Sequence, residues 1–251
     1  MPDRISVVRQ SHDDQIISML ADQKLRFETD LNVSGTPRGK YSINNLMADL
    51  LARFSTRHEF EWSLLCIAQY DPEMKSWSNR FNEQFTFEIA VKELIKRDLS
   101  QSSCCGMHVC TTVASLMQLD DKHHLFTQET RELLNAYLES ALLAIEETRI
   151  DAGSVSPRWY QSPIFVKWAQ PKTANITKSM RFSLTDKMLA TSHFIELCSV
   201  LPESIEYDPR KLTPMYQFLN AAIIKLPPHL GKQHICPYSH SLKVVLSASE
   251  K

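Results

Sequence analysis

The sequence predicts an all-α protein, and three observations lead to that prediction. Apolar residues recur at spacings of three, four and seven, which is the period of one face of a helix. Only five glycines occur among the 251 residues. Patterns typical of strands, in which apolar and polar residues alternate, are almost absent. We therefore expect a single helical domain over residues 1–251, with a long ordered loop at about 150–181.

The expected helices alternate between two kinds. Segment 42–54 carries Ile43, Leu46 and Leu50 on one side and polar residues on the other, which indicates a helix with one face in solvent. Segment 59–70 has little polar surface, so we expect it to be buried nearly all round. In chain order, the expected helical segments are 11–24, 42–54, 59–70, 86–95, 106–119, 127–148, 185–201, 211–226 and 236–248.

Several of these segments begin at a residue that can cap a helix. Ser11, Ser42, Thr86 and Thr127 each precede an apolar periodic run, and a hydroxyl at that position can accept a hydrogen bond from a free backbone N–H. The stretch 150–181 lacks periodicity and contains three prolines and two tryptophans. A connection of that length usually packs as an ordered loop or serves a site.

Alternation of buried and half-exposed helices is typical of concentric rings of helical hairpins. The inner helices of such a ring touch protein on every side, whereas the outer helices do not. We therefore expect a partial or open α/α toroid of about four to five hairpins. Inner helices of a ring run parallel, so their N-termini gather at one end, where we expect a site. The inner helices would be 11–24, 59–70, 106–119, 185–201 and 236–248.

Cysteine and histidine residues stand near the start of several expected inner helices. Cys105 and His108 are three residues apart, and Cys236 and His240 are four apart, so each pair can share one face of a helix. His193 adds a third imidazole. Zinc favours mixed thiolate and imidazole ligands, with four in structural sites and three plus a water in catalytic sites. We interpret these five residues as candidate metal ligands, with zinc as the expected ion.

Two other interpretations of the same residues stay open. A thiolate at a helix N-terminus beside a histidine can act as a nucleophile, here Cys105 or Cys236 with His108 or His240 as the base. Alternatively, the thiols are small apolar packing residues and the histidines are buried, hydrogen-bonded ones.

Two H-x-x-E elements, His58 to Glu61 and His193 to Glu196, add candidate catalytic carboxylates. Glu61 and Glu196 can each serve as a general base or orient an imidazole. The simpler interpretation is a local pair between positions i and i+3 of a helix.

Composition excludes several classes of partner. Lys plus Arg total 28 against 29 for Asp plus Glu, so the chain lacks the basic surface that nucleic acid requires. We expect no nucleic-acid partner and no membrane, because no apolar run is long enough to span a bilayer. The N-terminus has no apolar segment typical of a signal peptide. The six cysteines are interpreted as reduced thiols of a cytoplasmic protein.

Three short elements resemble a known family. Cys105-Gly106-Met107-His108 is similar to C-G-G-T-H, residues 191–197 are similar to T-G-H-H-L-E-W, and residues 236–240 are similar to C-P-Y-[ST]-H. These motifs belong to an uncharacterised family of bacterial helical proteins. More distantly, the chain resembles the toroids of terpenoid cyclases and protein prenyltransferases. The resemblance implies an α/α toroid with a Cys/His site. The acid-rich D-D-x-x-D and D-x-D-D runs are absent, which speaks against prenyl diphosphate chemistry.

For function, the sequence favours a ligand- or metal-binding toroid protein, and it leaves open whether that protein is an enzyme. One form of the hypothesis is a zinc-dependent enzyme acting on a small molecule or a peptide. The alternative is a non-catalytic interaction scaffold that binds a protein segment, with the cysteines and histidines in structural roles. Measurement of bound metal would separate the two.

Overall fold

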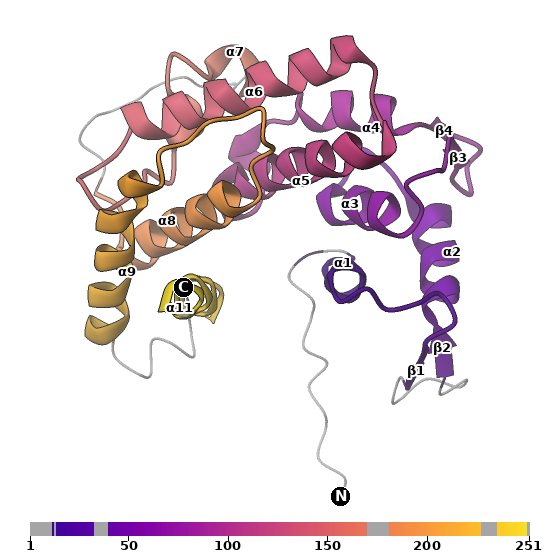
Figure 1. Ribbon diagram of the computed structural model, residues 1–251, viewed down its shortest axis with the longest axis horizontal. Coiled ribbons are helices and arrows are strands. Elements are labelled where there is room, and N and C mark those ends of the chain that lie inside the picture. The colour runs from indigo at the N-terminus through magenta and orange to yellow at the C-terminus, as the bar shows by residue number, and fades with distance from the viewer. Residues whose placement is uncertain (1–11, 13, 33–39, 170–180, 227–234, 250–251) are drawn as a thin grey trace, which may run out of the picture. The chain divides into compact units, whose positions relative to one another are not determined.

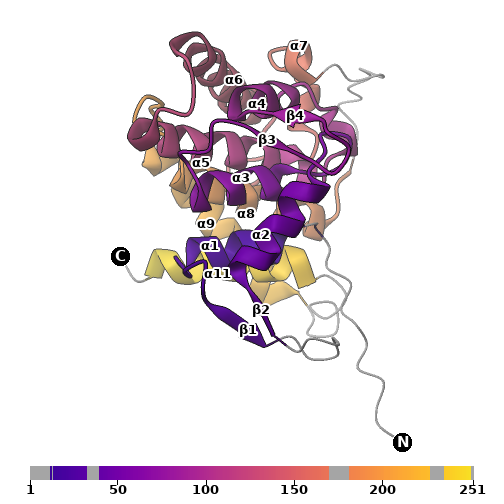
Figure 2. The ribbon, with the colours of Figure 1, turned by 90° about the vertical axis from the view of Figure 1, so that its right-hand side faces the viewer.

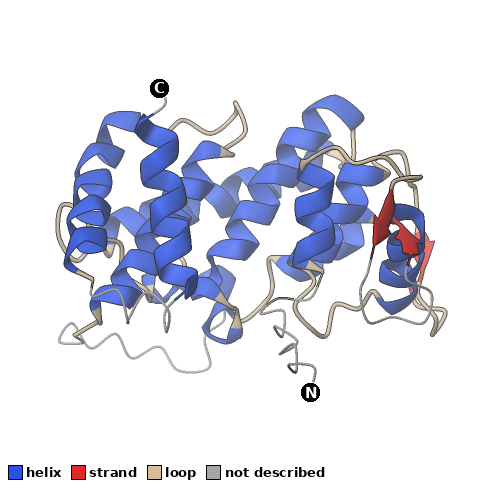
Figure 3. Cartoon of the chain, turned by 90° about the horizontal axis from the view of Figure 1, so that it is seen from below, coloured by secondary structure: helices blue, strands red, loops and turns tan. Residues whose placement is uncertain are grey.

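The computed structural model describes residues 12, 14–32, 40–169, 181–226 and 235–249. It confirms the all-α class, because helices make up most of these residues and the strands form two short pairs (Figure 3). Contacts within the chain divide it into two compact units, Met1–Ala90 and Val91–Lys251, named unit 1 and unit 2 here.

Unit 1 combines helices with two short antiparallel hairpins. Strand β1 pairs with β2 in a register that places Leu31 opposite Tyr41. Strand β3 pairs with β4, with Trp77 opposite Phe85. The elements are α1 (Gln15–Asp22), β1 (Asp30–Asn32), β2 (Lys40–Ser42), α2 (Ile43–Arg53), α3 (Glu61–Tyr70), β3 (Trp77–Ser78) and β4 (Gln84–Phe85).

Ser11 and Ser42 are predicted helix caps that belong to unit 1. Ser42 caps α2 as expected: its hydroxyl accepts from the Asn45 N–H, and the Asn45 side chain accepts from the Ser42 N–H. Ser11, the predicted cap of the first helix, lies outside the described residues. Helix α3 is buried along most of its length, as its continuous apolar run indicates.

Unit 2 contains most of the helices. Helix α4 (Phe87–Leu94) begins at the end of unit 1 and finishes in unit 2. The other helices among the described residues of this unit are α5 (Met107–His123), α6 (Gln128–Glu147), α7 (Val166–Ala169), α8 (Leu184–Ser199), α9 (Thr213–Lys225) and α11 (Ile235–Ser249). Short 3₁₀ turns precede or join them: η1 (Leu99–Gln101), η2 (Cys104–Gly106), η3 (Trp159–Gln161) and η4 (Pro209–Leu212).

Helix α8 forms the centre of unit 2. It packs against α5 and α11, and α11 lies below α8 in Figures 1 and 2. Phe194 and Leu197 of α8 are fully buried, so this helix has little surface left for solvent. The candidate site lies where α5 and α11 pack against α8.

The predicted loop at 150–181 is described as far as residue 169. Its first part holds an isolated bridge between Asp151 and Ser154, followed by η3 and α7. Trp159 of η3 is fully buried. Its indole N–H donates to the backbone carbonyl of Cys105 at 2.9 Å, so this loop holds the segment that carries the cysteines.

The toroid stays a prediction, because it concerns the arrangement of both units together. Within unit 2 the two predicted kinds of helix are present: α5 is buried along most of its length, whereas α6 leaves Leu143 59% exposed. Among the described helices, none has both the length and the apolar character needed to cross a bilayer.

Candidate metal centre

The segment before α5 has an unusual backbone. Cys104, Cys105 and Gly106 have φ values of 51°, 61° and 72°, so three consecutive residues adopt the left-handed region. That region is disfavoured for residues with a Cβ atom. Glycine suits the third position, because a Cβ on Gly106 would meet the Cβ of Leu99 at 2.9 Å. This turn directs successive cysteine side chains differently from a helix.

Three side chains from three elements come together beside this turn. The Sγ atoms of Cys104 in η2 and Cys236 in α11 are 4.0 Å apart. One ring nitrogen of His193 in α8 lies within 4.8 Å of both sulfur atoms. The three residues could hold a metal ion, and they come from positions as far apart as 132 residues in sequence.

A carboxylate lies on the other side of the histidines. Oε2 of Glu196 is 2.8 Å from Nδ1 of His193, and Oε1 is 2.9 Å from Nδ1 of His240. The ammonium group of Lys243 adds a contact at 3.2 Å from Oε1. The ligand atoms of His193, Glu196 and His240 all lie within 4.8 Å of one another, so they form a second group able to hold a cation.

Three histidines of unit 2, His108, His193 and His240, lie in a row. The ring of His193 lies 4.8 Å from that of His108, edge to face, and 4.1 Å from that of His240. A donor atom of His108 also lies within 4.8 Å of the sulfur of Cys104. His193 is only 2% exposed, and its Nε2 atom has no hydrogen-bond partner among the described residues.

The charges of the site are coupled. The pKa of Cys236 is lowered, first by the hydrogen bond from the Cys104 thiol and then by the neighbouring imidazoles of His193 and His240. Burial alone would lower the pKa of His240, but its interactions with Cys236 and Glu196 raise it to about 9. Burial likewise opposes ionisation of Glu196, yet hydrogen bonds from the two imidazoles lower its pKa far below the ordinary range. The site therefore favours a thiolate and a carboxylate on either side of positive charge.

Four of the five predicted metal ligands are in this region: His108, His193, Cys236 and His240. Cys105 belongs to neither of the two donor groups, and Cys104 lies beside Cys236 instead. Burial raises the pKa of the Cys105 thiol to about 12. The prediction placed Cys105 and His108 on one face of a helix, whereas α5 begins at Met107 and Cys105 belongs to the left-handed turn before it.

The helix positions also differ from the expected gathering of N-termini. His108 is the second residue of α5 and Cys236 the second of α11, but His193 lies in the second half of α8. The site therefore combines two helix starts with the middle of a third helix. Packing of α8 between its neighbours produces this arrangement, and helical periodicity alone cannot reveal it.

The two candidate catalytic carboxylates have different surroundings. Glu196 contacts both histidines, as described above. Glu61 belongs to unit 1, where its Oε2 atom accepts a hydrogen bond from the backbone N–H of Phe60 at 2.8 Å. Its H-x-x-E partner His58 is exposed. The second H-x-x-E element, His193 to Glu196, belongs to the candidate centre of unit 2.

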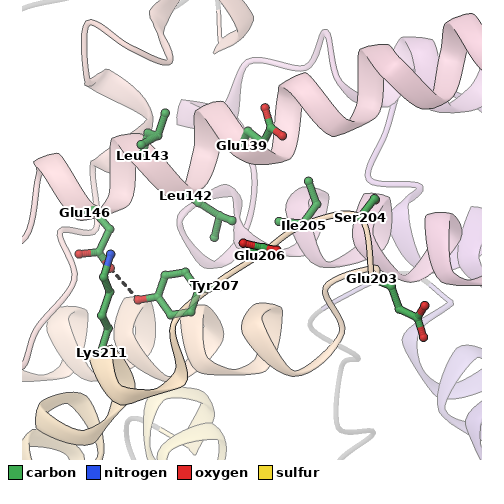
Figure 4. Close-up of a pocket in the computed structure, with 10 residues that line it drawn as sticks. All are labelled: Glu139, Leu142, Leu143, Glu146, Glu203, Ser204, Ile205, Glu206, Tyr207 and Lys211. Atoms are coloured by element: carbon green, nitrogen blue, oxygen red, sulfur yellow. Dashed lines mark hydrogen bonds between the residues drawn. The ribbon is translucent and has the colours of Figure 1, made fainter.

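A separate pocket of about 530 Å³ opens between α6 and the stretch that leads into η4 (Figure 4). The hydroxyl of Tyr207 donates to Glu146 at 2.6 Å across it. None of the cysteines or histidines of the centre lines this pocket. The lining residues are Glu139, Leu142, Leu143, Glu146, Glu203, Ser204, Ile205, Glu206, Tyr207 and Lys211.

Comparison of the chain with protein-family models, curated proteins and solved structures found no match. Support for a function therefore comes from the geometry and the chemistry of the donor atoms in unit 2.

Proposed function

We propose that unit 2 binds a zinc ion through Cys104, His193, Cys236 and His240. The separation of the two sulfur atoms is the main support. Two thiolates bound at about 2.3 Å to one tetrahedral ion lie about 3.8 Å apart, and the Sγ atoms of Cys104 and Cys236 are 4.0 Å apart. Little movement of either side chain is needed to accept the ion.

The orientation of the histidines supports the same proposal. Histidine ligands usually donate their second ring N–H to a carboxylate, which fixes the tautomer and the direction of the ring. The carboxylate of Glu196 contacts the Nδ1 atoms of both His193 and His240. That leaves Nε2 of each ring for a metal. Since buried polar atoms are nearly always hydrogen-bonded, the buried Nε2 of His193, which has no partner among the described residues, favours a ligand at this point.

The donor types favour zinc. Thiolates are soft ligands, imidazole is of intermediate softness, and a set of two of each is common in tetrahedral zinc sites. Four protein donors leave no open position, so we propose a structural ion that joins η2, α8 and α11. Binding free energy would then add to the folding free energy of unit 2. We further propose a cytoplasmic location, where the six cysteine thiols, none of which is in a disulfide, would stay reduced.

Metal analysis tests the proposal. The full chain is purified without a histidine tag, and zinc is measured by mass spectrometry of the elements before and after reconstitution. We expect one zinc per chain, with loss in Cys104→Ser and in Cys236→Ser. Cys105→Ser is the matched control, because it removes the adjacent thiol and keeps the carbonyl that receives Trp159. Absence of stoichiometric zinc after reconstitution would contradict the proposal.

A thiol nucleophile is the second candidate, because one arrangement specifically favours it. Cys236 interacts with His240, and His240 interacts with Glu196 at 2.9 Å. A nucleophile, a base and an orienting carboxylate follow one another in the same order in cysteine hydrolases. Zinc-free protein that alkylates fastest at Cys236, with a rate that falls in His240→Ala, would support this candidate if no metal is bound. If no metal is bound and the alkylation rate is the same in the wild type and in His240→Ala, the interaction scaffold is the remaining candidate.

A further inference from the structure

We propose that Cys104 and Cys236 form a reversible disulfide when a peroxide oxidises the protein, and that this disulfide and the zinc ion exclude each other. The inference concerns the regulation of the same site. Its second half rests on the proposed zinc function, whereas the disulfide itself depends only on the two thiols.

The distance between the sulfur atoms supports the disulfide. They are 4.0 Å apart, and a disulfide bond is about 2.05 Å long. The sulfur atoms must therefore approach by about 2 Å, a movement within the reach of side-chain rotation alone. Cys104 belongs to a turn and Cys236 to the first turn of α11, so neither thiol is held in the middle of a helix.

The surroundings favour this pair over other pairs of cysteines. The structure describes all six cysteines, and only Cys104 and Cys236 lie within hydrogen-bond distance of each other's sulfur atom. Both are partly exposed, so a small oxidant can reach them. Cys110, by contrast, is fully buried and its sulfur contacts the hydroxyl of Tyr137 at 3.9 Å. We therefore expect oxidation to join two specific thiols.

The oxidation proceeds in two balanced steps with hydrogen peroxide as the oxidant. The thiolate of Cys236 attacks one peroxide oxygen, the O–O bond breaks, and a sulfenic acid forms with release of hydroxide. The thiolate of Cys104 then attacks the sulfenic sulfur, the S–S bond forms, and a second hydroxide leaves. Two protons convert the hydroxides to water. In total, the two sulfur atoms lose two electrons, and the peroxide gains them.

Loss of the zinc follows from the change at sulfur. Metal binding requires deprotonated thiolates, and a disulfide carries no such charge. After oxidation, only the imidazoles of His193 and His240 remain of the four proposed ligands. Two neutral donors hold zinc far more weakly than two thiolates and two imidazoles. Reduction of the disulfide restores the thiolates and hence the site.

The test uses the full chain loaded with zinc. The protein is treated with hydrogen peroxide, released zinc is followed with a chromogenic chelator, and the disulfides are mapped by mass spectrometry of non-reduced peptides. We expect a Cys104–Cys236 cross-link to appear in step with release of one zinc, and dithiothreitol to reverse both. Cys105→Ser should behave like the wild type. Zinc release with sulfinic acids and no cross-link, or a link to Cys105 instead, would overturn the inference.

A parallel arm separates this inference from the zinc proposal. Chelator-treated wild-type protein is oxidised in the same way, so the result does not depend on the folding of a variant. A Cys104–Cys236 link in a protein that takes up no zinc would support the disulfide and contradict the metal function. Stoichiometric zinc uptake by a protein that never forms the link would support the metal function and contradict the disulfide.

Discussion

Glu196 accepts hydrogen bonds from the Nδ1 atoms of both His193 and His240, at 2.8 and 2.9 Å. One carboxylate therefore sets the direction of two imidazoles that belong to different helices. Because Glu196 also contacts Lys243, the two rings and the ammonium group share a single negative charge. The geometry of the centre depends on this residue even though the proposed zinc ligands do not include it.

The variant Glu196→Gln tests that dependence. An amide keeps the shape of the side chain but loses the charge that holds both imidazoles. Changes of this kind usually reduce metal affinity by about 10- to 100-fold. We expect a loss of zinc affinity in that range, measured by competition with a chelator of known affinity. The control is Glu203→Gln, which changes an exposed carboxylate of unit 2. This variant should bind zinc as the wild type does.

Gly106→Ala should destabilise the protein. A Cβ at φ +72° is strained by about 1–2 kcal/mol, and it would meet Leu99 at 2.9 Å. We expect a loss of about 2 kcal/mol or more in the free energy of unfolding, measured by urea denaturation. The double variant Gly106→Ala with Leu99→Ala removes the clash but not the backbone strain. A single variant as stable as the wild type would contradict this account of the turn.

The pair Asp120 and Asp121 offers a comparison of a buried with an exposed carboxylate. Asp120 is 1% exposed, accepts from the Phe126 N–H at 2.8 Å and pairs with Arg131. Asp121 pairs with the same arginine from the surface. We expect Asp120→Asn to cost about 3 kcal/mol of unfolding free energy and Asp121→Asn less than about 1 kcal/mol. Equal losses in the two variants would show that burial does not decide the effect.

The helices could be predicted because each one repeats a local pattern many times. The segments expected at 42–54 and 127–148 correspond to Ile43–Arg53 and Gln128–Glu147, each after a Ser or Thr cap. The two hairpins were missed, because strands of two or three residues are too short to show alternation.

The candidate site was predicted less completely, for a physical reason. Cys236 and His240 lie on one helix, so their spacing is informative. Cys104 is the exception, since its position depends on a left-handed turn that the pattern of apolar residues does not encode. Adjacent cysteines followed by a glycine are a signal for such a turn, because glycine accepts positive φ readily. The role of Glu196 toward His240 depends on the packing of α8 against α11 and has no signal in sequence spacing.

Tyr207, which lines the pocket beside α6, provides a test outside the candidate metal centre. Burial and the hydrogen bond to Glu146 raise the pKa of this tyrosine, so the folded state keeps its proton above pH 10, where the unfolded state loses it. The resulting stability is complete below about pH 10 and decreases as the pH rises further, by at most about 1.4 kcal/mol per pH unit. Tyr207→Phe lacks this dependence and should cost about 1–2 kcal/mol at neutral pH. We therefore expect the two urea unfolding curves to approach each other above pH 10, whereas a constant difference would show that the proton of Tyr207 is held no more tightly in the folded state.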